Sequence, residues 1–227
     1  ESTRPGARPL TLEQELKRVI PIVRQLAADL PVPLSVDTSR PEVMQAAAEA
    51  GAGMINDVRA LREPGAIATA FELRLPVCLM HMRGEPATMQ DDPYYEDVVS
   101  EVHTFLSERL ACCQKAGICR AKVLVDPGFG FGKTPEHNQQ ILERLDSYLD
   151  LGAPLLVGLS RKSFLRHKTD KKKRGHVSAA HALRAARKGA AMVRVHDVGL
   201  TLKSIRDWEG RSADTDQHSC AGESIRA

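Results

Sequence analysis

The pattern that decides the fold of this chain lies in residues 54–81, MINDVRALREPGAIATAFELRLPVCLMH. A short apolar run over 54–55 ends in Asn56, helix-forming residues follow over 64–74, and a second apolar run over 77–80 ends in a histidine. Apolar strands separated by a helix form a βαβ unit, and such units build parallel sheets. In both strands a polar residue stands at the carboxyl end, where α/β folds carry their chemistry.

The same unit repeats on both sides of this segment. Toward the amino terminus, a helical pattern over 11–30 has Thr11 as its N-cap and Pro21 as a predicted kink or break. The remaining predicted elements follow one another in the same alternation, and their residues are, in order, strand 32–36 ending in Asp37, helix 41–50, then after residue 81 helix 95–117, strand 123–125 ending in Asp126, helix 135–149, strand 155–159 ending in Ser160, helix 178–188, strand 191–195 reaching His196, and helix 199–208.

Six strands alternating with helices predict an α/β fold, a TIM (β/α)8 barrel that is incomplete here. A full barrel takes about 250 residues, and this chain opens with a helix, so we expect the first two of eight strands to be absent. We expect one partial barrel domain over residues 1–210 and a tail without regular structure over 211–227. The alternative is an open doubly wound sheet, which would bind its ligand at one switch point, whereas here every strand end is polar.

The composition is that of an ordinary globular protein. Of the 227 residues, 42% are hydrophobic and 27% charged, and the net charge of +3 is too small to indicate nucleic acid or a membrane surface as partner. No apolar run has the length of a membrane span. The five cysteines are odd in number and lack paired metal-ligand spacing, which favours a reducing cytoplasm. We therefore expect small-molecule partners.

Three strand ends carry the groups that we consider first. Asp37, Asn56 and Asp126 each end an apolar run, and each alone could equally be a structural cap to its own loop. Together they place two carboxylates and an amide around one barrel mouth. Such a set accepts hydrogen bonds from a planar ligand rich in N–H groups, such as a 2-aminopterin ring.

Two cationic segments follow the later strands. Arg194 and His196 share one face of a strand, and a guanidinium beside an imidazole suits a phosphate or diphosphate better than an internal carboxylate bridge. Lys162 and Ser163 offer a point charge and a hydroxyl for an anion or a carbonyl oxygen. A Schiff-base role for Lys162 stays open.

The glycine-rich segment GFGFGKT, residues 128–134, invites comparison with nucleotide-binding loops but matches none of them. A Walker loop needs glycine where Pro127 stands, and the dinucleotide pattern needs glycine where Lys133 stands. The glycines fit tight turns beside a ligand, to which Phe131 offers an aromatic face. Met80, at the end of a strand, either lines a flat ring pocket or belongs to the core.

Seven motifs together resemble the dihydropteroate synthases, in order and in spacing, from residue 1 to about residue 208. They are ESTRPG (1–6), SVDTS (35–39), IND (55–57), LMH (79–81), DPGFGFGK (126–133), SRKS (160–163) and RVHDV (194–198).

The resemblance implies a β/α barrel, usually a homodimer, that joins p-aminobenzoate to a dihydropterin methyl diphosphate with Mg2+ and releases pyrophosphate. It implies catalytic roles for Asp126, Lys162, Arg194 and His196. The implied pterin diphosphate site comprises Thr3, Asp37, Asn56, Met80, Asp126, Phe131, Gly158, Lys162, Arg194, Val195 and His196. The implied p-aminobenzoate site comprises Thr3, Arg4, Pro5, Phe131, Lys162 and Ser163.

Two departures from the family pattern stand out. The loop Asn-Val-Thr-Pro-Asp-Ser-Phe, which supplies the family's Mg2+ ligand, does not occur in this chain, so we expect no metal ligand here. Val177 also replaces a usual glycine. Two rival interpretations are an inactive pterin-binding fragment and a pterin-dependent methyltransferase; the ESTRPG and SRKS motifs disfavour the second.

Overall fold

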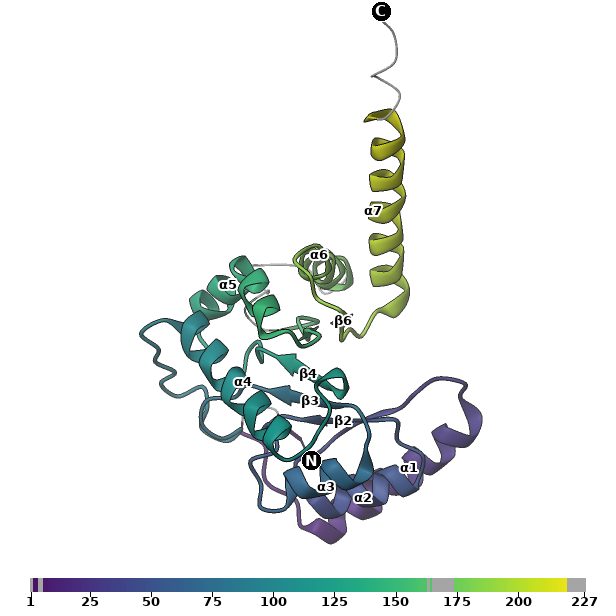
Figure 1. Cartoon of the computed structure of the whole chain (residues 1–227), viewed down its shortest axis with the longest axis vertical. Helices are drawn as coiled ribbons and strands as arrows, with labels where there is room; N and C mark the ends of the chain where they lie inside the picture. Colours follow the sequence, from purple (N-terminus) through teal and green to yellow (C-terminus); the bar gives the residue numbers. More distant parts are fainter. Residues whose placement is uncertain (1, 4–5, 163, 165–173, 220–227) are drawn as a thin grey trace, which may run out of the picture.

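The computed structural model describes residues 2–3, 6–162, 164 and 174–219, and in them strands and helices alternate along the chain (Figure 1). The strands are β1 (Ser35–Asp37), β2 (Met54–Asp57), β3 (Val77–Met80), β4 (Val123–Asp126), β5 (Leu156–Val157) and β6 (Met192–Val193). The helices are α1 (Leu12–Asp29), α2 (Pro41–Glu49), α3 (Ala66–Leu73), α4 (Val98–Lys115), α5 (Pro135–Glu143), α6 (Arg174–Arg187) and α7 (Val198–Ser219), with 3-10 turns η1 (Arg120–Lys122) and η2 (Leu145–Leu151).

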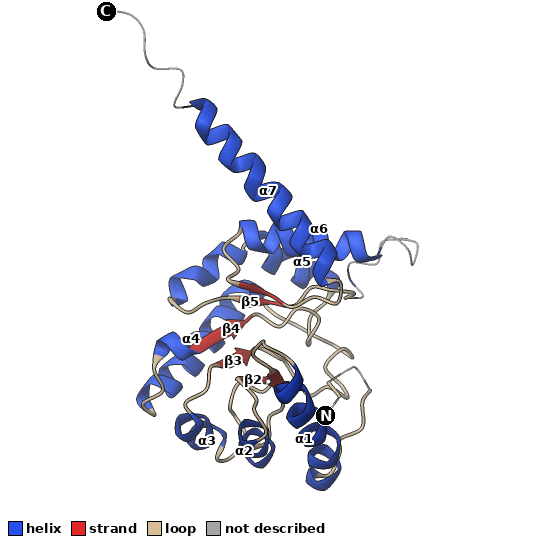
Figure 2. Cartoon of the chain, turned by 90° about the vertical axis from the view of Figure 1, so that its right-hand side faces the viewer, coloured by secondary structure: helices blue, strands red, loops and turns tan. Residues whose placement is uncertain are grey.

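All six strands pair in parallel, as the sequence predicted. One sheet has the order β1-β2-β3-β4 and the other pairs β5 with β6, and an isolated parallel bridge between Val125 and Leu155 joins the two sheets. Within the described residues, β1 pairs only with β2 and β6 only with β5, so the barrel wall is open between β1 and β6. Figure 2 shows the strands in the centre, with helices α1 to α3 on one side and α5 and α6 on the other.

Alternation along the strands separates an outer from an inner layer. Residues such as Ile55, Leu79 and Val125 face the surrounding helices and belong to the largest apolar cluster. Their neighbours on the opposite face form a compact plug inside the barrel, and its members are Met54, Cys78, Leu124 and Leu156. In a barrel, the next inward positions toward the carboxyl ends form the layer above such a plug.

Local capping sets several helix ends. Thr11 starts α1 through a reciprocal capping box with Gln14, and the helix runs through Pro21 without a break. Helix α4 begins at Val98 rather than at residue 95, because Asp97 accepts the free N–H groups of the first turn. The predicted helix 135–149 is two elements, since Arg144 leaves the helical conformation between α5 and η2.

Helix α7 extends away from the body of the molecule (Figure 1). The structure describes it through Ser219, which includes the first part of the tail that the sequence predicted to lack regular structure; residues 220–227 lie outside the described residues. The domain boundary at residue 210 stays a prediction. Among the described helices, none combines the length and the apolar character that a membrane span requires.

Candidate functional site

The inward positions above the barrel plug bring together residues that are far apart in the sequence. In each strand, the residue two positions after the one at the level of the plug points the same way, into the barrel. In chain order these residues are Asp37, Asn56, Met80, Asp126, Gly158 and Arg194. We call these six residues the barrel-mouth layer. The sequence predicted each of them as a site residue, and the parallel register of the strands explains why they meet.

Arg194 links the two carboxylates of this layer. Its Nη1 lies 3.3 Å from Oδ2 of Asp37, and its Nη2 lies 4.0 Å from Oδ2 of Asp126. A Cβ on Gly158 would lie 3.4 Å from the guanidinium, so this glycine leaves room for the arginine to cross the mouth. Arg194 therefore forms the carboxylate bridge that was the less favoured interpretation of the sequence.

The two carboxylates differ in their access to water. The side chain of Asp126 is 2% exposed and that of Asp37 is 46% exposed. Burial raises the pKa of Asp126, and the Arg194 guanidinium opposes this effect. Desolvation also raises the pKa of Asp37, against Arg194, although the exposed half of this side chain limits the effect. Asp126 also accepts the backbone N–H of Gly128 at 2.8 Å.

Asn56 is buried, yet within the described residues neither its Oδ1 nor its Nδ2 has a partner with hydrogen-bond geometry. Its amide is close enough to Asp37 to lower the pKa of that carboxyl. The next residue, Asp57, is by contrast fully engaged: it accepts the hydroxyl of Ser39 and the backbone N–H groups of Arg59 and Leu61. A buried amide without partners costs free energy, so Asn56 is the group in this layer that most requires a ligand.

The glycine-rich segment places an aromatic ring beside a cation. The Nζ of Lys162 lies 4.3 Å from the ring centroid of Phe131, and Phe131 is 7% exposed. Burial lowers the pKa of Lys162 to about 8, with Asp126 acting in the opposite direction. Met80 packs with Phe131, Val58 and two further methionines, which makes one apolar wall.

His196 is held by the loop that follows β5. The buried hydroxyl of Ser160 lies 2.9 Å from Nδ1 of His196 and 3.2 Å from its backbone nitrogen. Val195, between Arg194 and His196, is partly buried. Thr3 is partly buried too, and its contact with the site stays a prediction. Arg4, Pro5 and Ser163 lie outside the described residues.

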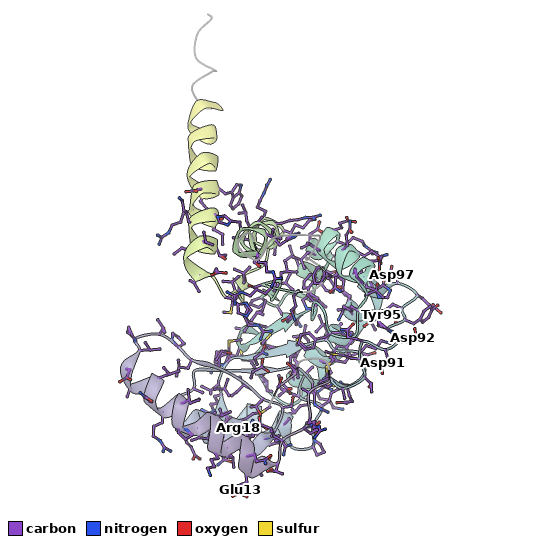
Figure 3. All side chains as sticks on the ribbon, turned by 180° about the vertical axis from the view of Figure 1, so that it is seen from behind. Glu13, Arg18, Asp91, Asp92, Tyr95 and Asp97 are labelled. Atoms are coloured by element: carbon purple, nitrogen blue, oxygen red, sulfur yellow. The ribbon has the colours of Figure 1, made fainter. Side chains whose placement is uncertain are left out.

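Lys133 and His81 form a buried pair that the sequence analysis missed. The Nζ of Lys133 lies 2.9 Å from Nδ1 of His81 and donates to the carbonyl oxygens of Gly128 and Phe131. Tyr95, labelled in Figure 3, donates to the carbonyl of Gly132 from the segment between β3 and α4. The only sequence signal was a lysine closing a glycine-rich run, a pattern that solvent-exposed loops share.

Within the described residues, no group of three His, Cys, Asp or Glu side chains is placed to hold a metal ion. The barrel-mouth layer instead combines hydrogen-bond acceptors, an amide and cationic groups. Its two carboxylates and one amide accept or exchange hydrogen bonds, and Arg194, Lys162 and His196 surround them with positive charge or N–H donors.

Comparisons with known proteins agree with this chemistry. The profile of the pterin binding enzymes matches residues 1–196. The dihydropteroate synthase of Escherichia coli K12 is 50% identical over 208 residues, which cover 91% of this chain and 74% of that protein.

Solved structures give the same result. Xanthomonas albilineans dihydropteroate synthase with 4-aminobenzoic acid matches with a TM-score of 0.88 and 49% identity, over 94% of this chain and 77% of that one. The same enzyme in complex with 7,8-dihydropteroate matches with a TM-score of 0.84 and 46% identity, over 92% and 78%. The predicted parallel barrel class is thereby confirmed.

Proposed function

This chain belongs to the pterin binding enzymes, and among them to the dihydropteroate synthases, and we propose from that membership that its barrel-mouth layer binds the pterin substrate. The reaction of these transferases joins p-aminobenzoate to a dihydropterin methyl diphosphate and gives 7,8-dihydropteroate and pyrophosphate in folate biosynthesis. The observation that carries the residue assignment is the buried amide of Asn56 beside Asp37: neither polar atom of this amide has a partner with hydrogen-bond geometry in the described structure.

We propose that Asp37, Asn56 and Asp126 bind the pterin edge. The amino group and ring N–H of a 2-aminopterin are donors, which carboxylates accept, whereas its carbonyl needs a donor such as the amide of Asn56. Met80 and Phe131 supply the apolar walls for the flat ring, and Lys162 adds a cation near its polar edge.

The diphosphate is assigned to the cationic side of the mouth. Arg194 offers a planar fork of donors, and His196 offers a ring nitrogen, with Val195 between them in sequence. The family resemblance adds Thr3 to this group. The Arg194 bridge to Asp37 is partly exposed, so its exchange for a diphosphate contact costs little. In the transition state the same guanidinium balances the charge that develops on the leaving pyrophosphate.

p-Aminobenzoate is assigned to the border formed by Phe131 and Lys162, together with Thr3, Arg4, Pro5 and Ser163. An aniline nitrogen is a weak nucleophile, so the bond from the methylene carbon to the diphosphate oxygen breaks early, before the new C–N bond is complete. The buried Asp126 carboxylate then stabilises positive charge on the pterin. The 4-aminobenzoic acid in the similar Xanthomonas structure supports a site for this substrate.

Mg2+ is the cofactor that the family resemblance implies. The described residues lack a cluster of three His, Cys, Asp or Glu side chains, so they do not fit a protein-built metal site. Mg2+ often binds through substrate phosphates and only one or two carboxylates. We therefore assign no metal ligand among the described residues and derive no catalytic step through the ion.

A homodimer and a cytoplasmic setting are also part of the proposal. The cytoplasmic setting is supported by the free thiols of Cys78, Cys112, Cys113 and Cys119, since a reducing compartment keeps such groups unpaired.

The substitution Asn56→Leu tests the pterin assignment. Because the amide has no partner in the described structure, its replacement by an apolar side chain of similar size should leave the thermal midpoint unchanged or raise it. The affinity for the dihydropterin diphosphate, measured by calorimetric titration, should fall about ten- to a hundredfold.

Asn138→Leu is the matched control for the stability measurement. Asn138 is equally buried, but its amide accepts the N–H of Gly130 and donates to the carbonyl of Thr134, so its loss should lower the thermal midpoint. An Asn56→Leu variant that melts early and binds the pterin normally would show that Asn56 serves the scaffold.

A further inference from the structure

Lys133 is a buried titratable group for which the proposed reaction has no use. Its side chain lies inside the protein, with the residue 3% exposed, and its Nζ has three partners: Nδ1 of His81 at 2.9 Å and the carbonyl oxygens of Gly128 at 2.9 Å and Phe131 at 3.1 Å. An ammonium group has three donors, so all of its hydrogen-bonding capacity is used at this one place.

The two carbonyls belong to a single tight turn. The backbone N–H of Phe131 donates to the carbonyl of Gly128 at 3.1 Å, which closes the turn over residues 128–131. Lys133 therefore binds the first and the last residue of the turn at once. The middle of the turn is anchored separately, because Phe129 is buried in the main core and the N–H of Gly130 donates to Asn138.

The turn connects to both halves of the proposed site. At its start, the N–H of Gly128 donates to the carboxylate of Asp126. At its end, Phe131 presents its ring to Lys162, and a Cβ on Gly130 would touch the Lys162 side chain at 3.4 Å. A Cβ on Gly128 would collide with the carbonyl of His81, so the turn lies directly on the chain that follows β3.

Deprotonation of Lys133 would not release the 128–131 turn. Burial lowers the pKa of Lys133 to about 7, while Asp126 acts in the opposite direction and Lys162 in the same one. Burial and the Lys133 charge also lower the pKa of His81, so the imidazole is neutral and can accept at Nδ1. A neutral amine keeps two N–H donors, which still satisfy the two carbonyls.

We propose that Lys133 is a positioning residue of the transferase, which holds the 128–131 turn so that the Phe131 ring stands against Lys162 on the p-aminobenzoate side of the site. The inference rests on the proposed assignment of Phe131 and Lys162 to p-aminobenzoate. Lys133 itself does not touch the reacting atoms; it acts through the position of Phe131.

A double-mutant cycle with Lys133→Met and Phe131→Ala tests this. Methionine keeps an unbranched apolar stem and removes all three donors. We expect Lys133→Met to raise KM for p-aminobenzoate about tenfold. Because Phe131 is also assigned to the apolar wall of the pterin site, KM for the pterin diphosphate should rise as well, but by a smaller factor. Phe131→Ala should raise the same KM, and the double variant should be no worse than Phe131→Ala alone, because Lys133 acts through that ring.

A spectroscopic readout follows the turn without any substrate. The chain has five phenylalanines, so 4-fluorophenylalanine labelling gives a 19F spectrum in which the Phe131 signal is identified by its loss in Phe131→Ala. Lys133→Met should shift or broaden that signal selectively. If Lys133→Met does not yield folded protein, His81→Leu, which removes one acceptor and leaves the two carbonyl contacts, should give the same changes at smaller size.

Tyr148→Phe is the control, since it removes a buried hydrogen bond to the carbonyl of Val99, away from the site, and should lower stability without changing either KM. An unchanged Phe131 signal, or additive KM effects in the cycle, would overturn the positioning role of Lys133. A shifted signal in Lys133→Met together with a normal KM for p-aminobenzoate in Phe131→Ala would instead refute the substrate assignment and leave the hold on the turn intact.

Discussion

Asp37 and Asp126 are the same chemical group in two different environments, and the difference predicts how each responds to substitution. Asp126 is almost fully buried and capped by a backbone N–H, whereas Asp37 is half open to the barrel mouth. Removing Asp126 leaves the buried N–H of Gly128 without its acceptor, so we expect folding to suffer as well as binding. Asp37 is therefore the cleaner probe of pterin recognition.

We predict that Asp37→Ala weakens binding of a dihydropterin by about 1–3 kcal/mol, because donors of the ligand then lose their acceptor. The fold should persist, since Arg194 can still pair with Asp126. Calorimetric titration measures the affinity, and a thermal melt serves as the control for folding. Full affinity in a folded Asp37→Ala variant would remove Asp37 from the pterin site.

Lys162 predicts a pH dependence of the reaction. Burial lowers the pKa of its ammonium to about 8, so the positive charge is present below that pH and is lost as the pH rises through it. If the charge binds p-aminobenzoate, kcat/KM for this substrate should decline above about pH 8. A pH profile of Lys162→Met should lack this decline and stay low throughout. A decline that persists in Lys162→Met would point to another titrating group, such as Lys133, whose pKa burial lowers to about 7.

At the scale of elements, helix α1 supports the site from outside the barrel. Its Glu15 is buried, accepts the hydroxyl of Thr38 at 2.7 Å and pairs with Arg40 at 3.1 Å. Thr38 directly follows Asp37, so the helix fixes the chain just beyond the carboxylate. The capping box at Thr11 sets where this helix begins and thus which residue faces inward.

Thr11→Ala should lower the free energy of unfolding by about 1 kcal/mol, the usual loss when an N-cap hydroxyl is removed. The hydroxyl accepts the N–H of Gln14 at 3.2 Å, and the substitution removes this half of the capping box while the Gln14 side chain can still accept the N–H of residue 11. Urea unfolding measures the loss, and steady-state kinetics should show unchanged KM values. A raised KM for the pterin substrate would mean that a change at the start of α1 also displaces Asp37, through the contacts of Glu15 with Thr38 and Arg40.

The sequence identified the elements well where polarity changes abruptly. Asp37, Asn56 and Asp126 each follow apolar residues. The structure places Asp37 and Asp126 at the ends of β1 and β4 as predicted, and Asn56 one residue before the end of β2. The break at Arg144 between α5 and η2 left no comparable signal, because the apolar spacing continues through it. The sequence did not reveal the Lys133–His81 pair for a related reason: the burial of a lysine depends on tertiary neighbours, here from the chain just after β3, which a single loop motif does not identify.

At the scale of the molecule, the site is where the two sheets meet. The β1–β4 sheet contributes Asp37, Asn56 and Asp126, and the β5–β6 sheet contributes Arg194 from 157 residues away in sequence from Asp37. Arg194 is thus a contact between the sheets on the open side of the barrel wall, in addition to its proposed role in binding the diphosphate. Substitution of this residue tests both roles, because one predicts a loss for every ligand and the other a loss for the diphosphate alone.

We predict that Arg194→Ala weakens the dihydropterin methyl diphosphate by about 1.5–3 kcal/mol more than it weakens the free hydroxymethyl dihydropterin, because only the first presents an anion to the guanidinium. Titration of both ligands at one pH measures the difference, and Arg161→Ala, which removes an exposed partner of Asp197, is the control. Equal losses for the two ligands would assign Arg194 to the scaffold.

The same variant should also change how pterin binding responds to acid. Arg194 lowers the pKa of both Asp37 and Asp126, so its removal raises both values further above their ordinary range. A carboxylate that must be ionised to accept the pterin donors loses binding as the pH falls through its folded pKa, and the higher that pKa, the earlier the loss. The affinity of Arg194→Ala for the free pterin should therefore begin to fall at a higher pH than that of the unmodified protein. Calorimetric titrations of the two proteins over a series of pH values measure this shift. If the two pH profiles have the same shape, the ionisation that Arg194 controls has no effect on the ligand, and the carboxylates do not bind the pterin in their ionised form.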